Sequence, residues 1–334
     1  MKLSPHVETI ETSFSGRPLS LALLRGKQAA LVDTGLVGTP ADAIIPYLHT
    51  AGLDPTRLSL ILITHAHADH FGGNEEMRAA SGGKVRFAAH RLDQAWIENP
   101  PLETRRAYGH FVDLGLMPAA ELDGGIRASG NGVKLDTVLH GGEVFDLGDG
   151  VEIQVIFAPG HSFGNICLLE RKSGILIQGE TVAGVAQYNV KGELLTVPFY
   201  EDLQTYLQTI ATVAGLEFAT LHCSHLAVMD RAQARRYFGE SVDFAMRFEA
   251  EVVTRLRQAA QPATALDLWR SMDGLWGVYP HDLGLYMLLE SHLSGLVKRG
   301  KAEGSPLKGV RWLGPDGDDM APLADTARRA ISSM

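Results

Sequence analysis

Residues 60–70 read Leu60-Ile61-Leu62-Ile63-Thr64-His65-Ala66-His67-Ala68-Asp69-His70. The stretch opens with four apolar residues, which is typical of a buried strand, and continues with three histidines and one aspartate within six residues. A strand end holds the backbone rigid, small alanines let the loop turn, and imidazole and carboxylate groups bind zinc-like ions at about 2.0–2.2 Å. A chance cluster of histidines on a polar loop is the alternative, but the position directly after a strand argues against it. The stretch therefore predicts a metal site at a strand end.

The segments on either side of this stretch alternate between strand-like and helix-like patterns. Two apolar runs, residues 19–24 and 29–32, flank a turn and predict a β-hairpin that ends at Asp33-Thr34-Gly35. Further strands are expected at residues 85–89, 144–147, 151–158, 166–169, 175–177 and 218–221, and helices near residues 40–50, 74–80, 91–99, 103–116 and 201–214. This alternation predicts an α/β fold built in layers.

The pattern changes beyond residue 238, where charged amphipathic segments replace the apolar runs. Helices are expected at residues 240–258, 264–272 and 280–297, and a hairpin at residues 301–312. Three helices and a hairpin predict a winged-helix-like arrangement, although plain helical packing gives the same pattern. We therefore expect a metal-binding domain over residues 1–238 and a smaller helical or winged-helix-like domain over residues 239–334.

Composition and charge narrow the classes of function. The 334 residues carry a formal net charge of −9, which opposes non-specific capture of phosphate backbones and does not indicate a membrane-surface protein. The two cysteines, Cys167 and Cys223, lie in apolar runs and are expected to be reduced core residues. No cleavable leader is recognisable at the N-terminus, and nowhere do eighteen apolar residues follow one another. We therefore expect a cytoplasmic protein without a nucleic-acid or membrane partner.

The motif at residues 65–70 resembles the His-x-His-x-Asp-His motif of the metallo-β-lactamase superfamily. Further positions of that family follow in order after three of the expected strands, at Gly160-His161, Gly179-Glu180 and Cys223-Ser224-His225. The early Asp33 turn also has a counterpart there. The resemblance covers about residues 19–238. It implies a four-layer αββα sandwich that holds two divalent metal ions, with zinc expected and iron or manganese as alternatives, because nitrogen and oxygen ligands suit all three.

The resemblance also implies a role for each candidate residue. His65, His67 and His161 would hold one metal, Asp69, His70 and His225 the second, and Glu180 would bridge them. The family usually has an aspartate at the bridging position, so the extra methylene of Glu180 moves the carboxylate outward and leaves the metal spacing in question. His222 competes with His225 as the last ligand, and we favour His225. Asp33 either closes the hairpin or orients a ligand histidine.

The expected chemistry is hydrolysis by a metal-activated hydroxide, with Asp69 also passing a proton to the leaving group. The two-domain architecture resembles the glyoxalase-II-like thioesterases, acyl-CoA thioesterases and lactonases of the superfamily. A small-molecule thioester, such as an acyl-CoA, an ester or a lactone is therefore the expected substrate. Hydrolysis of a phosphodiester or RNA, and a metal-binding regulator that acts through its C-terminal domain, are the alternatives. The sequence leaves the oligomeric state open, a homodimer included.

Overall fold

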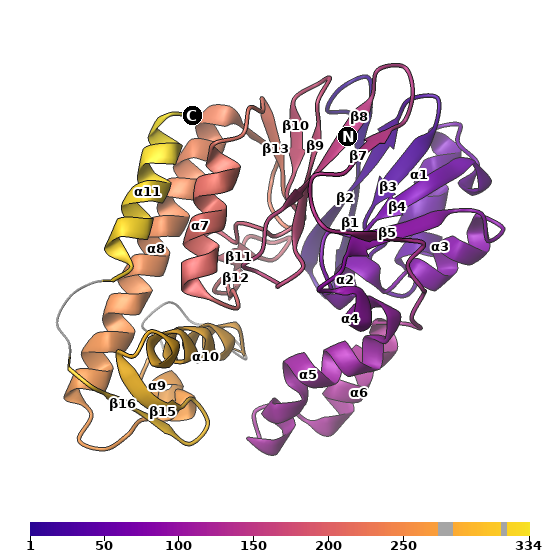
Figure 1. Ribbon diagram of the computed structural model, residues 1–334. Helices are drawn as coiled ribbons and strands as arrows, with labels where there is room; N and C mark the ends of the chain where they lie inside the picture. Colours follow the sequence, from indigo (N-terminus) through magenta and orange to yellow (C-terminus); the bar gives the residue numbers. More distant parts are fainter. Residues whose placement is uncertain (273–282, 315–318) are drawn as a thin grey trace. The chain divides into compact units, whose positions relative to one another are not determined.

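The computed structural model of the chain describes residues 1–272, 283–314 and 319–334 (Figure 1). Contacts between residues divide the chain into two compact units. The first consists of Met1–Ala158, Ser162–Glu180 and Phe218–Val228, and the second of Pro159–His161, Thr181–Glu217 and Met229–Met334. Helix α8 (Arg231–Gln258) runs without a break across residues 238 and 239. The division into domains over residues 1–238 and 239–334 stays a prediction.

A six-stranded sheet begins the first unit. Its order is β1 (Val7–Phe14), β2 (Arg17–Arg25), β3 (Ala29–Val32), β4 (Leu58–Leu62), β5 (Arg86–His90) and β6 (Thr137–Leu139). The first three strands are antiparallel, and the connections from β3 to β6 are parallel crossovers that contain helices. These helices are η1 (Pro40–Ile44), α1 (Ile45–Thr50), η2 (Pro55–Arg57), α2 (Ala68–Phe71), α3 (Asn74–Ala80), α4 (Gln94–Glu98), α5 (Pro100–Asp113) and α6 (Ala119–Ala128). The predicted hairpin and the helix at residues 74–80 are confirmed.

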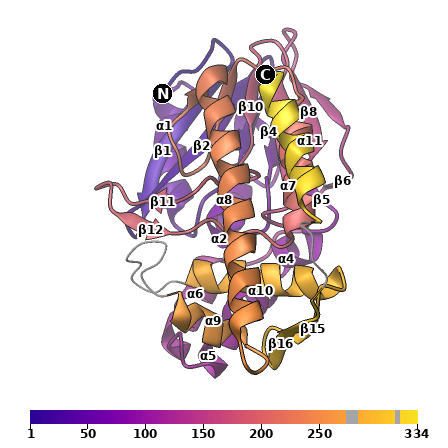
Figure 2. The same cartoon turned by 90° about the vertical axis from the view of Figure 1, so that its left-hand side faces the viewer.

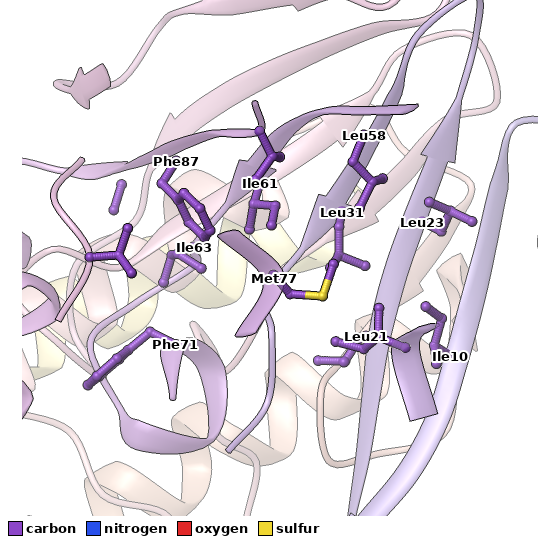
Figure 3. Close-up of a cluster of buried hydrophobic side chains, with 14 of the residues drawn as sticks. Ile10, Leu21, Leu23, Leu31, Leu58, Ile61, Ile63, Phe71, Met77 and Phe87 are labelled. Atoms are coloured by element: carbon purple, nitrogen blue, oxygen red, sulfur yellow. The ribbon is translucent and has the colours of Figure 1, made fainter. Parts of the chain in front are cut away.

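The first sheet is buried on both faces, because successive side chains of a strand point to opposite sides. Leu31 and Ile61 belong to a core that also contains Met77 of α3, and Figure 3 shows these side chains gathered beneath the strands. Their strand neighbours Val32 and Leu60 belong to a second core, which they share with residues of the other sheet. The apolar runs read from the sequence are therefore continuous rather than alternating.

The second sheet of this unit contains the strands that precede Glu180 and His225. Five of its strands lie in the unit, in the order β13 (Thr220–His222), β10 (Ile175–Ile177), β9 (Ile166–Glu170), β8 (Glu152–Phe157) and β7 (Val144–Asp146). The pair β10 and β13 is parallel, so both strands end at the same edge. The two cysteines are buried and unbridged here, as predicted. Gly179-Glu180 follows β10, and residues 223–225 follow β13.

The second unit is mainly helical. It contains β11 (Gln187–Tyr188), β12 (Leu194–Thr196), α7 (Leu203–Ala214), β14 (Met229–Asp230), α8, α9 (Ala265–Ser271), α10 (Leu283–Lys298), β15 (Ala302–Ser305), β16 (Gly309–Trp312) and α11 (Ala321–Ser332). Helices α8, α9 and α10 and the β15–β16 hairpin confirm the predicted three helices and hairpin, while the expected helix start at residues 280–282 lies outside the described residues. Helix α11 packs along α7 and α8 (Figure 2). Within the described ranges, the search for a helix long and apolar enough to cross a bilayer returns no candidate.

Candidate metal centre

Two groups of potential metal ligands gather at strand ends of the first unit. The ligand atoms of His65, His67 and Glu180 lie within 4.8 Å of one another, and the same limit holds for Asp69, His70 and His225. The first group combines the loop after β4 with the residue pair after β10. The second combines the same loop with the segment after β13. Three loops that are distant in sequence therefore converge, as the family resemblance implies.

The histidines of the loop after β4 are held through Asp33 and Thr64. The Asp33 carboxylate accepts hydrogen bonds from the Thr64 backbone at 2.7 Å, the Thr64 hydroxyl at 2.8 Å and Nδ1 of His70 at 2.8 Å. The Thr64 hydroxyl also lies 3.0 Å from Nδ1 of His65. A carboxylate that accepts a hydrogen bond from one ring nitrogen fixes the tautomer and the orientation of the imidazole. The other ring nitrogen then points toward the place where a metal ion would bind. Asp33 thus orients a histidine, which was one of its two predicted roles.

Local backbone geometry supports this arrangement at two places. Asp33 has a φ of 64°, an uncommon conformation for a residue with a side chain, and its three hydrogen bonds offset the strain. Gly179 has a φ of 59°, and a Cβ there would lie 2.8 Å from Oγ1 of Thr64. Only glycine fits so close to the threonine that orients His65. Gly179 is therefore required by the close packing against Thr64, which begins the loop that carries His65, His67, Asp69 and His70 (the ligand loop).

The Glu180 carboxylate lies between the two groups. Its Oε1 is 2.8 Å from Nε2 of His225, and its Oε2 is 3.8 Å from Nε2 of His65. Each oxygen therefore faces a different group, and the side chain is almost fully buried. The extra methylene relative to aspartate does not turn the carboxylate away from the site.

The structure separates the two histidines that follow β13. His225 donates from Nδ1 to the carbonyl of Pro18 at 2.6 Å, and its Nε2 lies 3.2 Å from Oδ2 of Asp69. His222 instead hydrogen-bonds through Nε2 to Ser20 at 2.8 Å, and burial lowers its pKa to about 4. His222 is thus a neutral core residue, whereas His225 belongs to the Asp69 group.

His161 lies in the short Pro159–His161 segment, which groups with the second unit. Within that unit, its Nδ1 donates a hydrogen bond to the carbonyl of Phe199 at 3.0 Å, and the imidazole is almost fully buried. The segment is linked covalently on both sides to residues of the first unit, Ala158 and Ser162. The role of His161 as a metal ligand is taken up as a proposal below.

Charge couples the members of the second group. Burial alone would lower the pKa of His225, but the carboxylates of Glu180 and Asp69 raise it to about 10. Burial would likewise raise the pKa of Asp69, but the imidazoles of His70 and His225 hold it well below its usual range. In the metal-free protein at neutral pH, the group therefore contains an ionised Asp69 and a protonated His225.

This charge state predicts how metal affinity depends on pH. A metal ion at His225 must displace the proton that the imidazole holds below about pH 10, so affinity should rise with pH. One displaced proton corresponds to about tenfold tighter binding per pH unit. Chelator competition at pH 6, 7 and 8 measures this slope. An affinity that stays constant over the three values would show that His225 carries no proton for the metal to displace.

Asp93 is a structural contributor that the sequence analysis missed. It occupies the N-cap position of α4, yet its side chain does not cap that helix. Its carboxylate instead accepts hydrogen bonds from the Ala66 backbone at 2.8 Å, the Gly164 backbone at 2.9 Å and the Ser162 hydroxyl at 3.0 Å. Ala66 lies between two candidate ligands, so Asp93 fastens the ligand loop to the β8–β9 connection. An aspartate before a helix is ordinarily read as a cap, which conceals this role.

Replacing Asp93 by alanine should destabilise the ligand loop. The change leaves two backbone N–H groups without their acceptor, and an unsatisfied buried donor costs about 1–3 kcal/mol. We expect a lower midpoint of urea unfolding and weaker metal binding. Asp54→Ala is the matched control, because its carboxylate accepts its two bonds from Thr56 at an exposed position. A variant as stable as the wild type would mean that other contacts hold the two loops.

The residues present fit a divalent metal centre. The donors are imidazole and carboxylate groups, the set that zinc, iron and manganese share. Among the described residues, the buried Nε2 of His70 has no hydrogen-bond partner, while its Nδ1 is held by Asp33. A buried polar atom without a partner is costly, and a coordinated cation would satisfy it. We conclude that the chemistry and the orientation of these side chains suit metal binding.

The chain is similar to several curated proteins over half or more of its length. Curated relatives include the "Acyl-coenzyme A thioesterase MBLAC2" of Gallus gallus, 31% identical over 185 residues that cover 50% of this chain and 59% of the relative. The "Lactamase-like protein adaB" of Aspergillus niger is 27% identical over 201 residues, or 60% of this chain and 47% of that protein. The chain thus spans about half the length of these relatives. The "Beta-lactamase-like protein 2 homolog" of Caenorhabditis elegans is 22% identical over 325 residues, covering 92% and 93% of the two chains.

Solved structures and a family model complete the comparison. A metallo-beta-lactamase family protein from Thermus thermophilus superposes with a TM-score of 0.69 at 20% identity, covering 93% of this chain and all of that one (100%). At this identity the likeness concerns the fold, and it confirms the predicted fold class. The sequence model of the "Metallo-beta-lactamase superfamily" matches residues 17–225, which is more than half of the chain and includes every candidate ligand. The extent of this match shows that the chain belongs to the metallo-β-lactamase superfamily.

Proposed function

We propose that the protein is a metal-dependent hydrolase that acts on a small-molecule thioester, with esters and lactones as related substrates. The observation that carries this proposal is the position of Glu180. One oxygen of its carboxylate faces His225 at 2.8 Å, and the other faces His65 at 3.8 Å. A carboxylate in this position can bridge two cations, and paired divalent ions are typical of metal-assisted hydrolysis.

The ligand roles in this proposal follow the two groups. His65, His67 and His161 would hold one ion, Asp69, His70 and His225 would hold the other, and Glu180 would contact both. For His161, the support is its position after β8 in the family order and the hydrogen bond from Nδ1 to the Phe199 carbonyl, which orients the ring. We propose zinc as the resident ion, with iron or manganese as alternatives.

The side chains define what each part of the site does. When bound, a pair of divalent ions lowers the pKa of a water molecule and polarises a substrate carbonyl. Asp33 and Thr64 keep the rings of His70 and His65 in a fixed orientation. Asp69 accepts the proton of the attacking water on a carboxylate oxygen and returns it to the leaving thiolate or alkoxide.

The thioester class is supported by the relatives rather than by the geometry. Acyl-coenzyme A thioesterases named MBLAC2 from cattle, chicken and human are 27–31% identical over half of this chain. Because the chain spans only part of their length, the acyl-CoA substrate is part of our proposal.

The C-terminal basic residues do not favour the nucleic-acid alternative. Five of them lie close in sequence: Lys298, Arg299, Lys301, Lys308 and Arg311. Three are paired with carboxylates, Lys298 with Asp202, Arg299 with Glu249 and Asp319, and Arg311 with Glu303. The formal net charge of −9 also opposes binding of a phosphate backbone, so the cluster is weak support for a nucleic-acid substrate.

An activity panel tests the proposed function. The purified protein is assayed with short and long acyl-CoA thioesters, a γ-lactone and bis(p-nitrophenyl) phosphate, before and after removal of metal with EDTA. We expect the highest kcat/KM for a thioester, loss of turnover on chelation and recovery on addition of zinc. Turnover of the phosphodiester alone would contradict the proposal, and turnover that is unaffected by chelation would exclude the metal.

A further inference from the structure

We propose that a buried chain of hydrogen bonds through Tyr200, His292 and Glu249 in the second unit positions the metal ligand His161. Glu249 and His292 lie beyond the residues that the family model matches, and no step of the proposed chemistry uses any of the three residues. The inference rests on the proposed function, because it takes His161 as a ligand. It gives helices α8 and α10 a role in holding His161, a residue of the same unit.

The first link joins His161 to the segment before α7. Nδ1 of His161 donates to the Phe199 carbonyl at 3.0 Å, and the backbone N–H of Glu201 donates to the Gly160 carbonyl at 2.7 Å. Two hydrogen bonds in opposite directions therefore fasten residues 199–201 to residues 160–161. The rotation of the His161 ring follows the position of the Phe199 carbonyl, as for ligand histidines in general.

The second link fixes Tyr200, which lies between the two anchoring residues. Its side chain is buried, and its ring stacks on Tyr206 with centroids 4.2 Å apart and an interplanar angle of 13°. Its hydroxyl lies 2.7 Å from Nε2 of His292 on α10. Burial and the neighbouring Tyr206 and Glu249 raise its pKa well above the usual range, so the phenol remains a donor. The backbone carbonyl of the preceding residue is thus tied to α10 through one side chain.

The third link sets the orientation of His292. Its Nδ1 lies 2.5 Å from Oε2 of Glu249 on α8, and Glu249 is also paired with Arg299. Nε of Arg299 in turn lies 3.1 Å from Oδ2 of Asp319. With Nδ1 of His292 donating to Glu249, its Nε2 accepts the hydrogen bond from the Tyr200 hydroxyl. The donors and acceptors of the chain therefore match at each step.

A merely structural role does not explain the polar character of this chain. An apolar cluster of the same volume would be at least as stable, because burying charged groups costs solvation energy that their pairing only partly returns. What a satisfied polar network adds is a unique direction for each side chain. Here the directed end is the Tyr200 hydroxyl, one residue from the carbonyl that holds His161. We therefore assign Tyr200 and His292 as positioning residues.

The experiment compares Tyr200→Phe with the wild type. The change keeps the ring and its stacking on Tyr206 but removes the hydroxyl that contacts His292. We expect zinc affinity, measured by chelator competition, to fall about tenfold, the lower end of effects seen for partners that orient ligands. The visible absorption spectrum of the cobalt-loaded protein should also change, because it reports ligand geometry. His292→Gln is a second variant that should weaken zinc binding in the same direction.

Two further variants make the result specific. Tyr47→Phe is the matched control, because it removes a hydroxyl that donates to Glu8 at 2.8 Å in the first unit, and its zinc affinity should equal that of the wild type. His161→Ala reports on the ligand itself. If His161→Ala weakens zinc binding while Tyr200→Phe and His292→Gln do not, the positioning role is wrong and the proposed ligand set stands. If Tyr47→Phe weakens binding as much as Tyr200→Phe, the positioning role is also wrong. If His161→Ala binds zinc as tightly as the wild type, the ligand assignment behind the proposed function fails.

Discussion

Replacing His67 by alanine is expected to abolish hydrolysis while the chain stays folded. Nδ1 of His67 lies 3.0 Å from Nε2 of His65, so the ring reaches into the first ligand group. Loss of a direct ligand should lower kcat/KM by more than about a hundredfold, the upper end for residues that only support a ligand. The large apolar cores that hold the first sheet do not include His67, so the fold should persist.

Enzyme assays and circular dichroism check the two parts of this prediction. His49→Ala, at an exposed position on α1, is the control and should retain full activity. A His67→Ala protein that is folded and still active would mean that the motif histidines do not carry the reaction. A variant that is unfolded without metal would instead show that the site contributes to the stability of the fold.

Replacing Glu180 by glutamine is expected to release metal. The substitution keeps the volume of the side chain but removes the negative charge that faces both ligand groups. Two cations held close together repel each other, so the site needs this charge to hold both. We expect the metal content to fall from two ions to one or fewer per chain.

The family residue provides a second variant at this position. Glu180→Asp shortens the side chain by one methylene, and we expect both ions to stay with an altered spacing and metal preference. Glu152→Gln is the control, since it removes a charge from an exposed pair with Arg171. Elemental analysis after gel filtration measures all three proteins. A Glu180→Gln protein that retains two ions would contradict the bridging role.

Strong local patterns made most of the first unit predictable. The apolar run before the histidines and the hairpin ending at Asp33 depend on residues adjacent in sequence, and both occur where they were expected. Strand β1 was missed because Val7–Phe14 mixes apolar and polar residues at the edge of the sheet. Helix α6 was missed because Gly124 and Gly125 lower its helix propensity.

One missed feature did have a local signal. Helix α8 was expected from residue 240 but begins at Arg231, after a capping box formed by Asp230 and Gln233. An aspartate followed three residues later by glutamine is a recognised helix start. The start of α8 could therefore have been predicted from the sequence.

The contacts of Asp93 and His292 could not be predicted from a local sequence pattern. Asp93 acts on Ala66 and Gly164, which lie 27 and 71 residues away in the chain. His292 reaches Tyr200 across 92 residues. Only the folded chain brings these groups together, whereas candidate ligands could be named because a metal requires particular residue types.

The proposed function rests on a pair of metal ions held on either side of the Glu180 carboxylate. Anomalous diffraction from crystals of the metal-loaded protein, collected above and below the zinc and iron absorption edges, tests it most directly. We expect two anomalous peaks, one beside His65, His67 and His161 and one beside Asp69, His70 and His225, with a Glu180 oxygen coordinating each ion. A single peak, or a Glu180 carboxylate more than about 4 Å from both ions and so beyond any coordination distance, would contradict it.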